Sequence, residues 1–289
     1  WSSDVCSSDL SGSTFTVDNT APTAAITYST PGPYKQGAEI TITATFNESM
    51  KSSPVPQISI NAPSSISNGE MTRTSPTTYT YSYTVGPDDG TATVSLSTGT
   101  DLAGNLLTST PTSGSTFTVD NTAPTAAITY SPSGPYKEGT DVTITATFSA
   151  AVEDSPIPEI SISLDDSTIL SSTDMTKSST TVYTYSYTVG AGDGTATVSI
   201  SDAQDAAGNS VSTITGSTFT VDNTAPTAAI TYSTSGPYVT GNEITITATF
   251  SEAVESSPVP QISISGANSL DASDMTQSSS TVYTYRSEE

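Results

Sequence analysis

The chain has 289 residues, with six Lys plus Arg against 29 Asp plus Glu and a net charge of −23. Such a charge repels nucleic acids and anionic membranes, so neither is an expected partner. One cysteine and no histidine argue against disulfides, thiol or imidazole catalysis and zinc sites. No run approaches the roughly 18 apolar residues of a membrane span, and the carboxylates are scattered in predicted loops. We therefore expect neither a membrane span nor an enzyme.

The two ends of the chain do not match its interior. Residues 4–10 read DVCSSDL, the translation of a common sequencing adapter, and residues 286–289 read RSEE, which the reverse complement of the adapter's end encodes. Such segments are set aside before any interpretation of the fold. We expect 1–10 and 286–289 to be adapter-derived, so that Cys6 plays no part in function.

The predicted elements are short strands. Residues 38–46 place Ile40, Ile42 and Phe46 on one face and threonines on the other, the alternation of a half-buried strand. This pattern favours a folded sheet over the disorder or glycosylated stalk that abundant Ser and Thr could also indicate. Gly, Pro, Asn and Asp separate the strands, and no helical periodicity is present. In chain order, the strands predicted for the first complete repeat are 24–28, 38–46, 56–61, 69–74, 78–85, 91–97 and 114–120.

The segment GSTFTVDNTAPTAAITYS occurs three times, beginning at Gly12, Gly114 and Gly216, 102 residues apart each time. A period of this length corresponds to one whole domain per repeat. About seven short strands in about 100 residues is the count of an immunoglobulin-like sandwich. The sequence therefore predicts an all-β chain of tandem immunoglobulin-like β-sandwich domains in an elongated array.

Three motifs carry a family resemblance: the VDNTAP junction, the segment Phe250 to Val254 (FSEAV) and the DxAGN loop. In this order and spacing they resemble the bacterial Ig-like repeats of very large secreted adhesins, over residues 11–285. We expect the following division: 11–20, the last strand of a preceding domain; 21–122 and 123–224, complete domains; 225–285, a domain without its last two strands. We expect this last piece to be unstable by itself, because its apolar faces and strand edges are unpaired.

Candidate ligand residues gather at the predicted junctions between domains. In a seven-stranded sandwich the DxAGN loop lies at the domain's N-terminal end, where it faces the VDNTAP linker, and the loop after the fifth strand of the preceding domain points to the same place. The first junction contains Asp18, Asn19, Asp101 and Asn105. The second contains Asp88, Asp89, Asp120, Asn121, Asp205 and Asn209. The third contains Asp193, Asp222 and Asn223.

Two interpretations of these residues stay open. Carboxylate, amide and carbonyl oxygens without nitrogen or sulfur donors are what Ca²⁺ prefers, and an ion would stiffen the joint between two domains. The family resemblance implies Ca²⁺ at such linkers. Alternatively, Asp and Asn only cap turns. Glu153 and Asp154 are left out, because the matching loop of the first unit, Asn47 to Lys51, has a different charge pattern.

Two other features have simple explanations. Tyr79, Tyr81 and Tyr83 alternate along one strand, and we expect them to fill the core and its rim rather than to stack sugars. Lys35 and Lys137 invite the idea of an isopeptide crosslink. The third repeat has Val239 at this position, so we expect no crosslink.

The function that we expect is mechanical: a stalk of an extracellular bacterial surface adhesin that projects a distal binding module, with joints stiffened by calcium. Its partners are then the neighbouring repeats, and a cell-surface or extracellular ligand would be bound by domains outside this chain. One alternative is a carbohydrate- or host-surface-binding module, with variable loops near 61–70 and 164–172. Another is the spacer region of a large secreted hydrolase.

Overall fold

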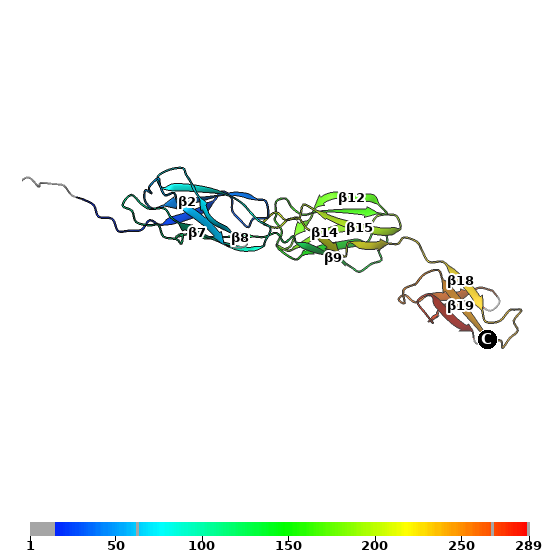
Figure 1. The fold of residues 1–289 in the computed structure, drawn as a ribbon. Helices are drawn as coiled ribbons and strands as arrows, with labels where there is room; N and C mark the ends of the chain where they lie inside the picture. The colour runs from blue at the N-terminus through cyan, green and yellow to red at the C-terminus, as the bar shows by residue number, and fades with distance from the viewer. Residues whose placement is uncertain (1–14, 62–63, 267–268, 288–289) are drawn as a thin grey trace, which may run out of the picture. The chain divides into compact units, whose positions relative to one another are not determined.

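The computed structural model describes residues 15–61, 64–266 and 269–287. Within these ranges every regular element is a β-strand (Figure 1), and no helix there could span a membrane. The described residues form two compact units, one of 15–190 with Gly194–Val221 and one of Ala191–Asp193 with 222–287. The predicted artefact 1–10, residues 11–14 of the predicted strand 11–20, and residues 288–289 lie outside the described residues.

The first unit begins with a sandwich of two four-stranded sheets. One sheet has the strand order β1-β2-β6-β5 and the other has the order β4-β3-β7-β8. All pairs are antiparallel. The strands are β1 (Ala24–Tyr28), β2 (Glu39–Phe46), β3 (Gln57–Asn61), β4 (Ile66–Glu70), β5 (Thr72–Arg73), β6 (Thr78–Thr84), β7 (Gly90–Ser97) and β8 (Thr116–Val119).

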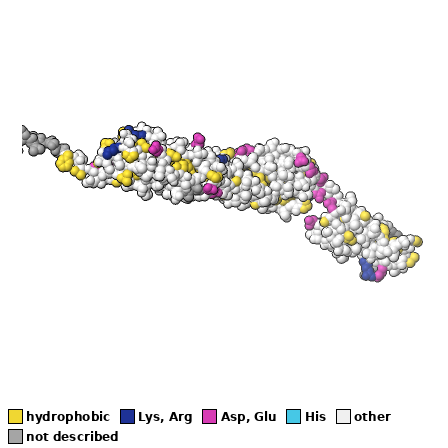
Figure 2. All heavy atoms as spheres, in the orientation of Figure 1, with side chains coloured by type: hydrophobic (Ala, Val, Ile, Leu, Met, Phe, Trp, Pro, Cys, Tyr) yellow, Lys and Arg dark blue, Asp and Glu magenta, His cyan; other side chains and the backbone are white. Residues whose placement is uncertain are grey.

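The alternation along β2 has the predicted effect. Ile40, Ile42 and Phe46 are buried, and Thr41 and Thr45 face the solvent. Burying each such aliphatic or aromatic side chain contributes about 1.5–3 kcal/mol. The tyrosines of β6 also fill the core and its rim, as predicted. On the face shown in Figure 2, most of the surface is backbone and side chains that are neither hydrophobic nor charged.

The single strand predicted at 69–74 is wrong. The structure has two strands there, β4 in one sheet and β5 in the other, so the chain crosses between the sheets. The crossing point is Met71, whose side chain is buried and whose N–H donates to the carbonyl of Pro56 at 3.0 Å. Met175 and Met275 make the same bond to Pro158 and Pro260. A sequence-based strand assignment cannot detect this change of partner.

The segment before β8 crosses between the sheets as well. Ser113 forms a parallel bridge with Ala25 in the first sheet, and the chain then turns at Gly114 into β8 of the second sheet. Gly114 has φ of +67°, and a Cβ atom there would lie 2.1 Å from the carbonyl oxygen of Ile26. Only glycine fits such a place, which explains the glycine that opens the repeated GSTFTVDN motif.

The second sandwich repeats the first, with one added strand. Its sheets have the orders β13-β14-β10-β9-β16 and β12-β11-β15-β17. The added strand β16 is parallel to β9 and extends the bridge seen at Ser113. The strands are β9 (Thr125–Ser131), β10 (Asp141–Phe148), β11 (Glu159–Leu164), β12 (Ser167–Asp174), β13 (Thr176–Lys177), β14 (Val182–Thr188), β15 (Gly194–Ser201), β16 (Thr213–Thr215) and β17 (Thr218–Val221).

The second unit contains the strands of the third repeat. They form the sheets β18-β19-β23-β22 and β20-β21, and no counterparts of β15 and β17 exist among its described residues. Ile230 is therefore 47% exposed, whereas its counterpart Ile128 is 4% exposed. The strands are β18 (Ala228–Tyr232), β19 (Ile244–Phe250), β20 (Gln261–Ile264), β21 (Leu270–Asp274), β22 (Thr276–Gln277) and β23 (Val282–Ser287).

The fold class is confirmed: the chain is all-β, with tandem immunoglobulin-like sandwiches. Two observations concern the ends of the described chain, while the division into domains stays a prediction. Residues 15–20 form no strand, because no described strand lies beside them, and Phe15 is 85% exposed. β23 continues through Arg286 and Ser287, beyond the expected boundary at 285.

Candidate functional site

The DxAGN loops of the two complete sandwiches are each organised around the side chain of their aspartate. In the first, Asp101 is fully buried, and its Oδ1 accepts the N–H groups of Gly104 at 2.6 Å and Asn105 at 2.8 Å. In the second, Oδ1 of the buried Asp205 accepts the N–H groups of Ala207 and Asn209 at 2.9 Å each. Both aspartates therefore act as turn formers, as the second interpretation of the sequence holds.

The asparagine of each loop holds the linker that enters its own domain. The Nδ2 group of Asn105 donates to the main-chain oxygen of Asp18 at 3.0 Å and to Asp101 at 2.8 Å. The Nδ2 group of Asn209 donates to the main-chain oxygen of Asp120 at 2.8 Å and to Asp205 at 3.0 Å. We name this pair of bonds the asparagine clasp. It fastens the linker to the following sandwich with protein groups alone.

The preceding sandwich holds the same linker from the other side. Asn121 donates its Nδ2 to the carbonyl of Pro87 at 3.0 Å, and its Oδ1 accepts the N–H of Gln36. The carboxylate of Asp89 accepts the N–H of Asn121 and, at 2.6 Å, the hydroxyl of Thr122. These bonds, first that of Thr122 and then that of Asn121, lower the pKa of Asp89.

In the second unit Asn223 repeats part of this arrangement. Its N–H donates to Asp193 and its Nδ2 to the carbonyl of Gly192. The linker aspartates also cap their own turns: Oδ1 of Asp18, of Asp120 and of Asp222 accepts the N–H two residues later, at 2.9–3.0 Å. The structure records no hydrogen bond for the side chains of the described residues Asn19 and Asp88.

Three carboxylates meet at the first junction. Oxygen atoms of Asp18, Glu48 and Asp101 lie within 4.8 Å of one another, and no other group of three acidic, His or Cys side chains in the described residues does so. Burial, followed by the negative charges of Asp18 and Asp101, raises the pKa of Glu48. Burial would also raise the pKa of Asp101, but the hydrogen bonds from Asn105 and Gly104 outweigh it and lower this pKa.

Glu48 was missed by the sequence analysis. It lies in the loop Asn47 to Lys51, which was set aside because the second repeat has a different charge pattern. That difference is the useful signal: the position of Glu48 is Ala150 in the second repeat and Glu252 in the third. The second junction consequently has no third carboxylate beside Asp120 and Asp205.

The donor set of the first junction suits a hard cation. Three carboxylates with no nitrogen or sulfur donor are the chemistry that Ca²⁺ prefers. The residues present therefore fit a calcium ion at the first junction.

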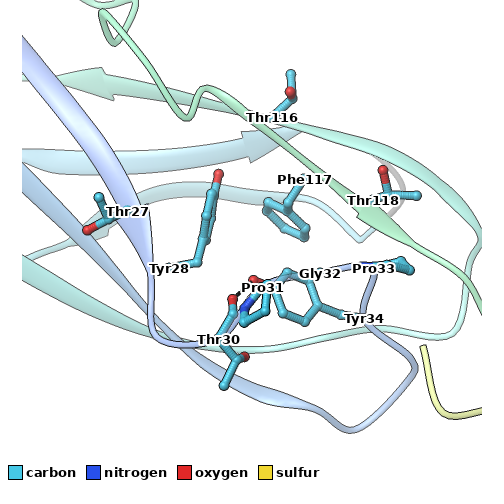
Figure 3. Close-up of a pocket in the computed structure, with 10 residues that line it drawn as sticks. All are labelled: Thr27, Tyr28, Thr30, Pro31, Gly32, Pro33, Tyr34, Thr116, Phe117 and Thr118. Carbon is cyan, nitrogen blue, oxygen red and sulfur yellow. Dashed lines mark hydrogen bonds between the residues drawn. The ribbon is translucent and has the colours of Figure 1, made fainter. Parts of the chain in front are cut away.

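An aromatic hollow of about 610 Å³ lies beside the first sandwich's edge, where the chain passes from β1 to the bridge between Tyr34 and Val119. Figure 3 shows the ring of Phe117 facing those of Tyr28 and Tyr34, with centroid distances of 5.4 and 5.8 Å. Both hydroxyls bond to main-chain carbonyls, Tyr28 to Gly114 at 2.6 Å and Tyr34 to Thr30. A smaller hollow of the same kind recurs in the second sandwich. The rings close the core, and their hydroxyls are already engaged.

The chain is similar at low sequence identity to several proteins of known structure. No curated protein matches the chain. Among solved structures, three N-terminal domains of the bacteriophage RB49 outer capsid protein Hoc are 14% identical, with a TM-score of 0.38, over 92% of this chain and 87% of that one. The human OSCAR ligand-binding domain is 9% identical, with a TM-score of 0.32, over 64% of this chain and 95% of that one.

A family model matches part of the chain. Residues 179–288 match the bacterial Ig-like domain (group 3). The matched range begins just before β14 of the second sandwich and ends in the third repeat, so it spans about one period but is displaced from the sandwich boundaries. Motifs in this range also occur 102 residues earlier, so the chain is similar to this family over one period of a repeated sequence.

Proposed function

We propose that these domains are structural spacers of a secreted bacterial surface adhesin, which hold a distal binding module away from the cell. The observation that carries the proposal is the linker between the two complete sandwiches, which both neighbours fasten: Asn209 from the following domain, and Asp89 and Pro87 from the preceding one. A linker bound on both sides resists bending. A spacer needs this property, whereas a catalytic or ligand-binding domain does not.

Each sandwich would add about 30–40 Å to the reach of the protein, judged from strand rise and end loops. A strongly acidic surface helps to keep such an array soluble outside the cell. Reach then depends on the number of repeats and on the stiffness of their joints, and not on which side chains face outward.

Surface display tests the spacer role. The full chain is placed between a membrane anchor and a reporter domain on a bacterial surface, and capture of the reporter by immobilised beads is measured. Deleting 123–224 should lower capture, and an unrelated sandwich of the same length in its place should restore it. If the unrelated sandwich fails, the repeats themselves bind something, and the spacer proposal is wrong.

We further propose that calcium stiffens the first junction, with Asp18, Glu48 and Asp101 as its carboxylate ligands. Burial and then the negative charges of Asp18 and Asp101 raise the pKa of Glu48, and an ion there would neutralise these charges. It would also connect the linker to two loops of the sandwich. Extracellular calcium modules bind at about 10⁻⁴–10⁻³ M, so the site would fill after export. Calcium at Asp120, Asn121, Asp205 and Asn209, or at Asp193, Asp222 and Asn223, stays a prediction.

Thermal unfolding tests the calcium proposal. The midpoint of the full chain is recorded in EDTA, in millimolar Ca²⁺ and in millimolar Mg²⁺; ligand binding to the native state alone must raise it. Asp18→Ala should abolish a Ca²⁺-specific rise. Asp120→Ala is the matched control, because it removes the same turn-capping bond where no third carboxylate exists. A rise that persists in Asp18→Ala, or no rise in the unchanged chain, rejects calcium at this junction.

A further inference from the structure

One direct contact joins the bodies of the two complete sandwiches. The Nζ group of Lys35, in the first sandwich, donates to the main-chain oxygen of Gly208 at 2.6 Å. Gly208 belongs to the DxAGN loop of the second sandwich, 173 residues further along the chain. Both residues lie in the same compact unit. The contact thus bypasses the linker and fixes one domain to the next.

The lysine is held in place by the residues on either side of it. The N–H of Tyr34 donates to Thr118, and the carbonyl of Tyr34 accepts the N–H of Asp120 at 2.9 Å. The N–H of Gln36 donates to the side chain of Asn121. The backbone around Lys35 is therefore bound to the start of the linker. Only the lysine side chain has to be ordered when it bonds to its acceptor.

The acceptor is part of the main chain. Gly208 has φ of +84°, and the bond from its N–H to the carbonyl of Asp205, at 2.9 Å, fixes the loop. Any DxAGN loop of this conformation presents the same carbonyl, whatever its side chains. Consequently the acceptor does not distinguish one repeat from another, and the residue at the position of Lys35 decides whether the contact forms.

That position differs between the repeats. It is Lys35 in the first, Lys137 in the second and Val239 in the third, each after the same GPY sequence. Valine has no hydrogen-bond donor on its side chain and is too short to reach across a joint. The repeats otherwise share the motifs that build the linker, so this one position changes the contact without changing the fold.

We propose that the lysine of a GPYK repeat is a docking group for the DxAGN loop of the following repeat, and that a GPYV repeat ends in a looser joint. The array would then contain stiff and flexible joints, and one residue in each repeat would determine which kind of joint follows it. This inference rests on the proposed spacer function, because it specifies how the stiffness of each joint is set.

Pulsed electron resonance between two nitroxides tests the inference on the full chain. Cys6→Ser removes the native thiol, and Thr93→Cys and Thr197→Cys place one label on an exposed position of β7 and one on β15. Lys35→Val should broaden the distance distribution between the labels, with the ratio of closed to open joints falling roughly threefold. Lys35→Arg, which keeps a donor of similar reach, should restore the narrow distribution.

The matched control is Lys137→Val, which removes the same charge and length but takes no part in the joint between the first two sandwiches. A distribution unchanged by Lys35→Val, or broadened equally by Lys137→Val, overturns the docking proposal and leaves the spacer function standing. If the distance distribution is already broad in the labelled protein that retains Lys35, this joint is not stiff, and the spacer proposal fails as well.

Discussion

The first and second junctions share the asparagine clasp and differ in their number of carboxylates. In both, an aspartate forms the DxAGN loop, and an asparagine clasps the linker with bonds of 2.8–3.0 Å. Only the first adds a third carboxylate, because Glu48 stands where the second repeat has Ala150. The shared part explains why the DxAGN and VDNTAP motifs recur together. The different part shows that a third carboxylate can be gained or lost at one position without disturbing the clasp.

The charges near the two loops differ in the same way. A Cβ atom on Gly104 would lie 3.4 Å from the ammonium of Lys51, whereas a Cβ atom on Gly208 would lie 3.5 Å from that of Lys35, which comes from the preceding domain. The second repeat has Glu153 at the position of Lys51. The ammonium group near the loop therefore comes from the same repeat at the first junction and from the preceding repeat at the second junction.

The largest expected effect comes from removing the aspartate of the DxAGN loop, which both junctions share. Asp205→Ala leaves the N–H groups of Ala207 and Asn209 and the Nδ2 group of Asn209 without their buried acceptor. Leaving buried donors unpaired should lower the free energy of unfolding of the second sandwich by about 2–3 kcal/mol. Urea unfolding of the full chain measures it.

Asp174→Ala is the control for this change, because it removes an exposed carboxylate from β12 of the same sandwich. It should alter the free energy of unfolding by less than about 0.5 kcal/mol. Equal effects of the two substitutions would show that the loss of charge, and not the loss of the loop's acceptor, is responsible.

The second-largest expected effect comes from adding to the second junction the carboxylate that Glu48 supplies at the first. Ala150→Glu gives the second junction the acidic residue that the first junction has in Glu48. Without divalent ions the new carboxylate should lower the thermal midpoint of the second sandwich, since like charges repel near Asp120 and Asp205. In millimolar Ca²⁺ the midpoint should recover and rise above that of the unchanged chain.

Ala151→Glu adds the same charge one residue away, on an exposed position. It should show neither the fall in EDTA nor the recovery in Ca²⁺. If Ala150→Glu behaves in the same manner as this control, three carboxylates at a junction do not suffice for calcium, and the proposal for Asp18, Glu48 and Asp101 loses its basis.

The sequence predicted the fold well because its signals are local and repeated. Alternating Ile and Thr in β2 give the buried and exposed faces directly, and the turn residues mark most strand ends. The crossings between sheets at Met71 and Gly114 could not be predicted in this way. They depend on which strand lies alongside, and this information is not contained in a short window of sequence.

The candidate site was predicted in part. Topology correctly brought Asp205 and Asn209 to the linker at Asp120, but the bond uses the main-chain oxygen of Asp120 and not its carboxylate. The clasp is thus built from a backbone group, which every residue type supplies. Glu48 was overlooked because agreement between repeats was the criterion, and a site present in one repeat fails that criterion.

A smaller effect concerns the pH dependence of the first junction. The raised pKa of Glu48 means that the native state binds its proton more tightly than the unfolded state, so this group's contribution to stability falls as the pH rises above about 4.3. Glu48→Gln should therefore raise the thermal midpoint in EDTA at pH 7, and the gain should disappear toward pH 4. Glu252→Gln, at the same position of the third repeat, is the control and should leave the midpoint at pH 7 unchanged, because among the described residues Glu252 belongs to no group of three carboxylates.

The smallest expected effect concerns Asp89, on the other side of the linker. Its lowered pKa has the opposite effect on stability. The bonds from Thr122 and Asn121 favour the carboxylate, so the contribution of Asp89 to stability is complete above about pH 3.9 and is lost as the pH falls through the native pKa. Asp89→Asn should lower the midpoint slightly at pH 7, because the amide oxygen still accepts one of the two bonds, and the difference from the unchanged chain should close as the pH falls through the native pKa of Asp89. Asp88→Asn, which removes a carboxylate with no recorded hydrogen bond, should leave the whole pH profile unchanged. If both variants give the same profile, the bonds to Asp89 do not hold the linker, and the asparagine clasp from the following sandwich fastens this joint without them.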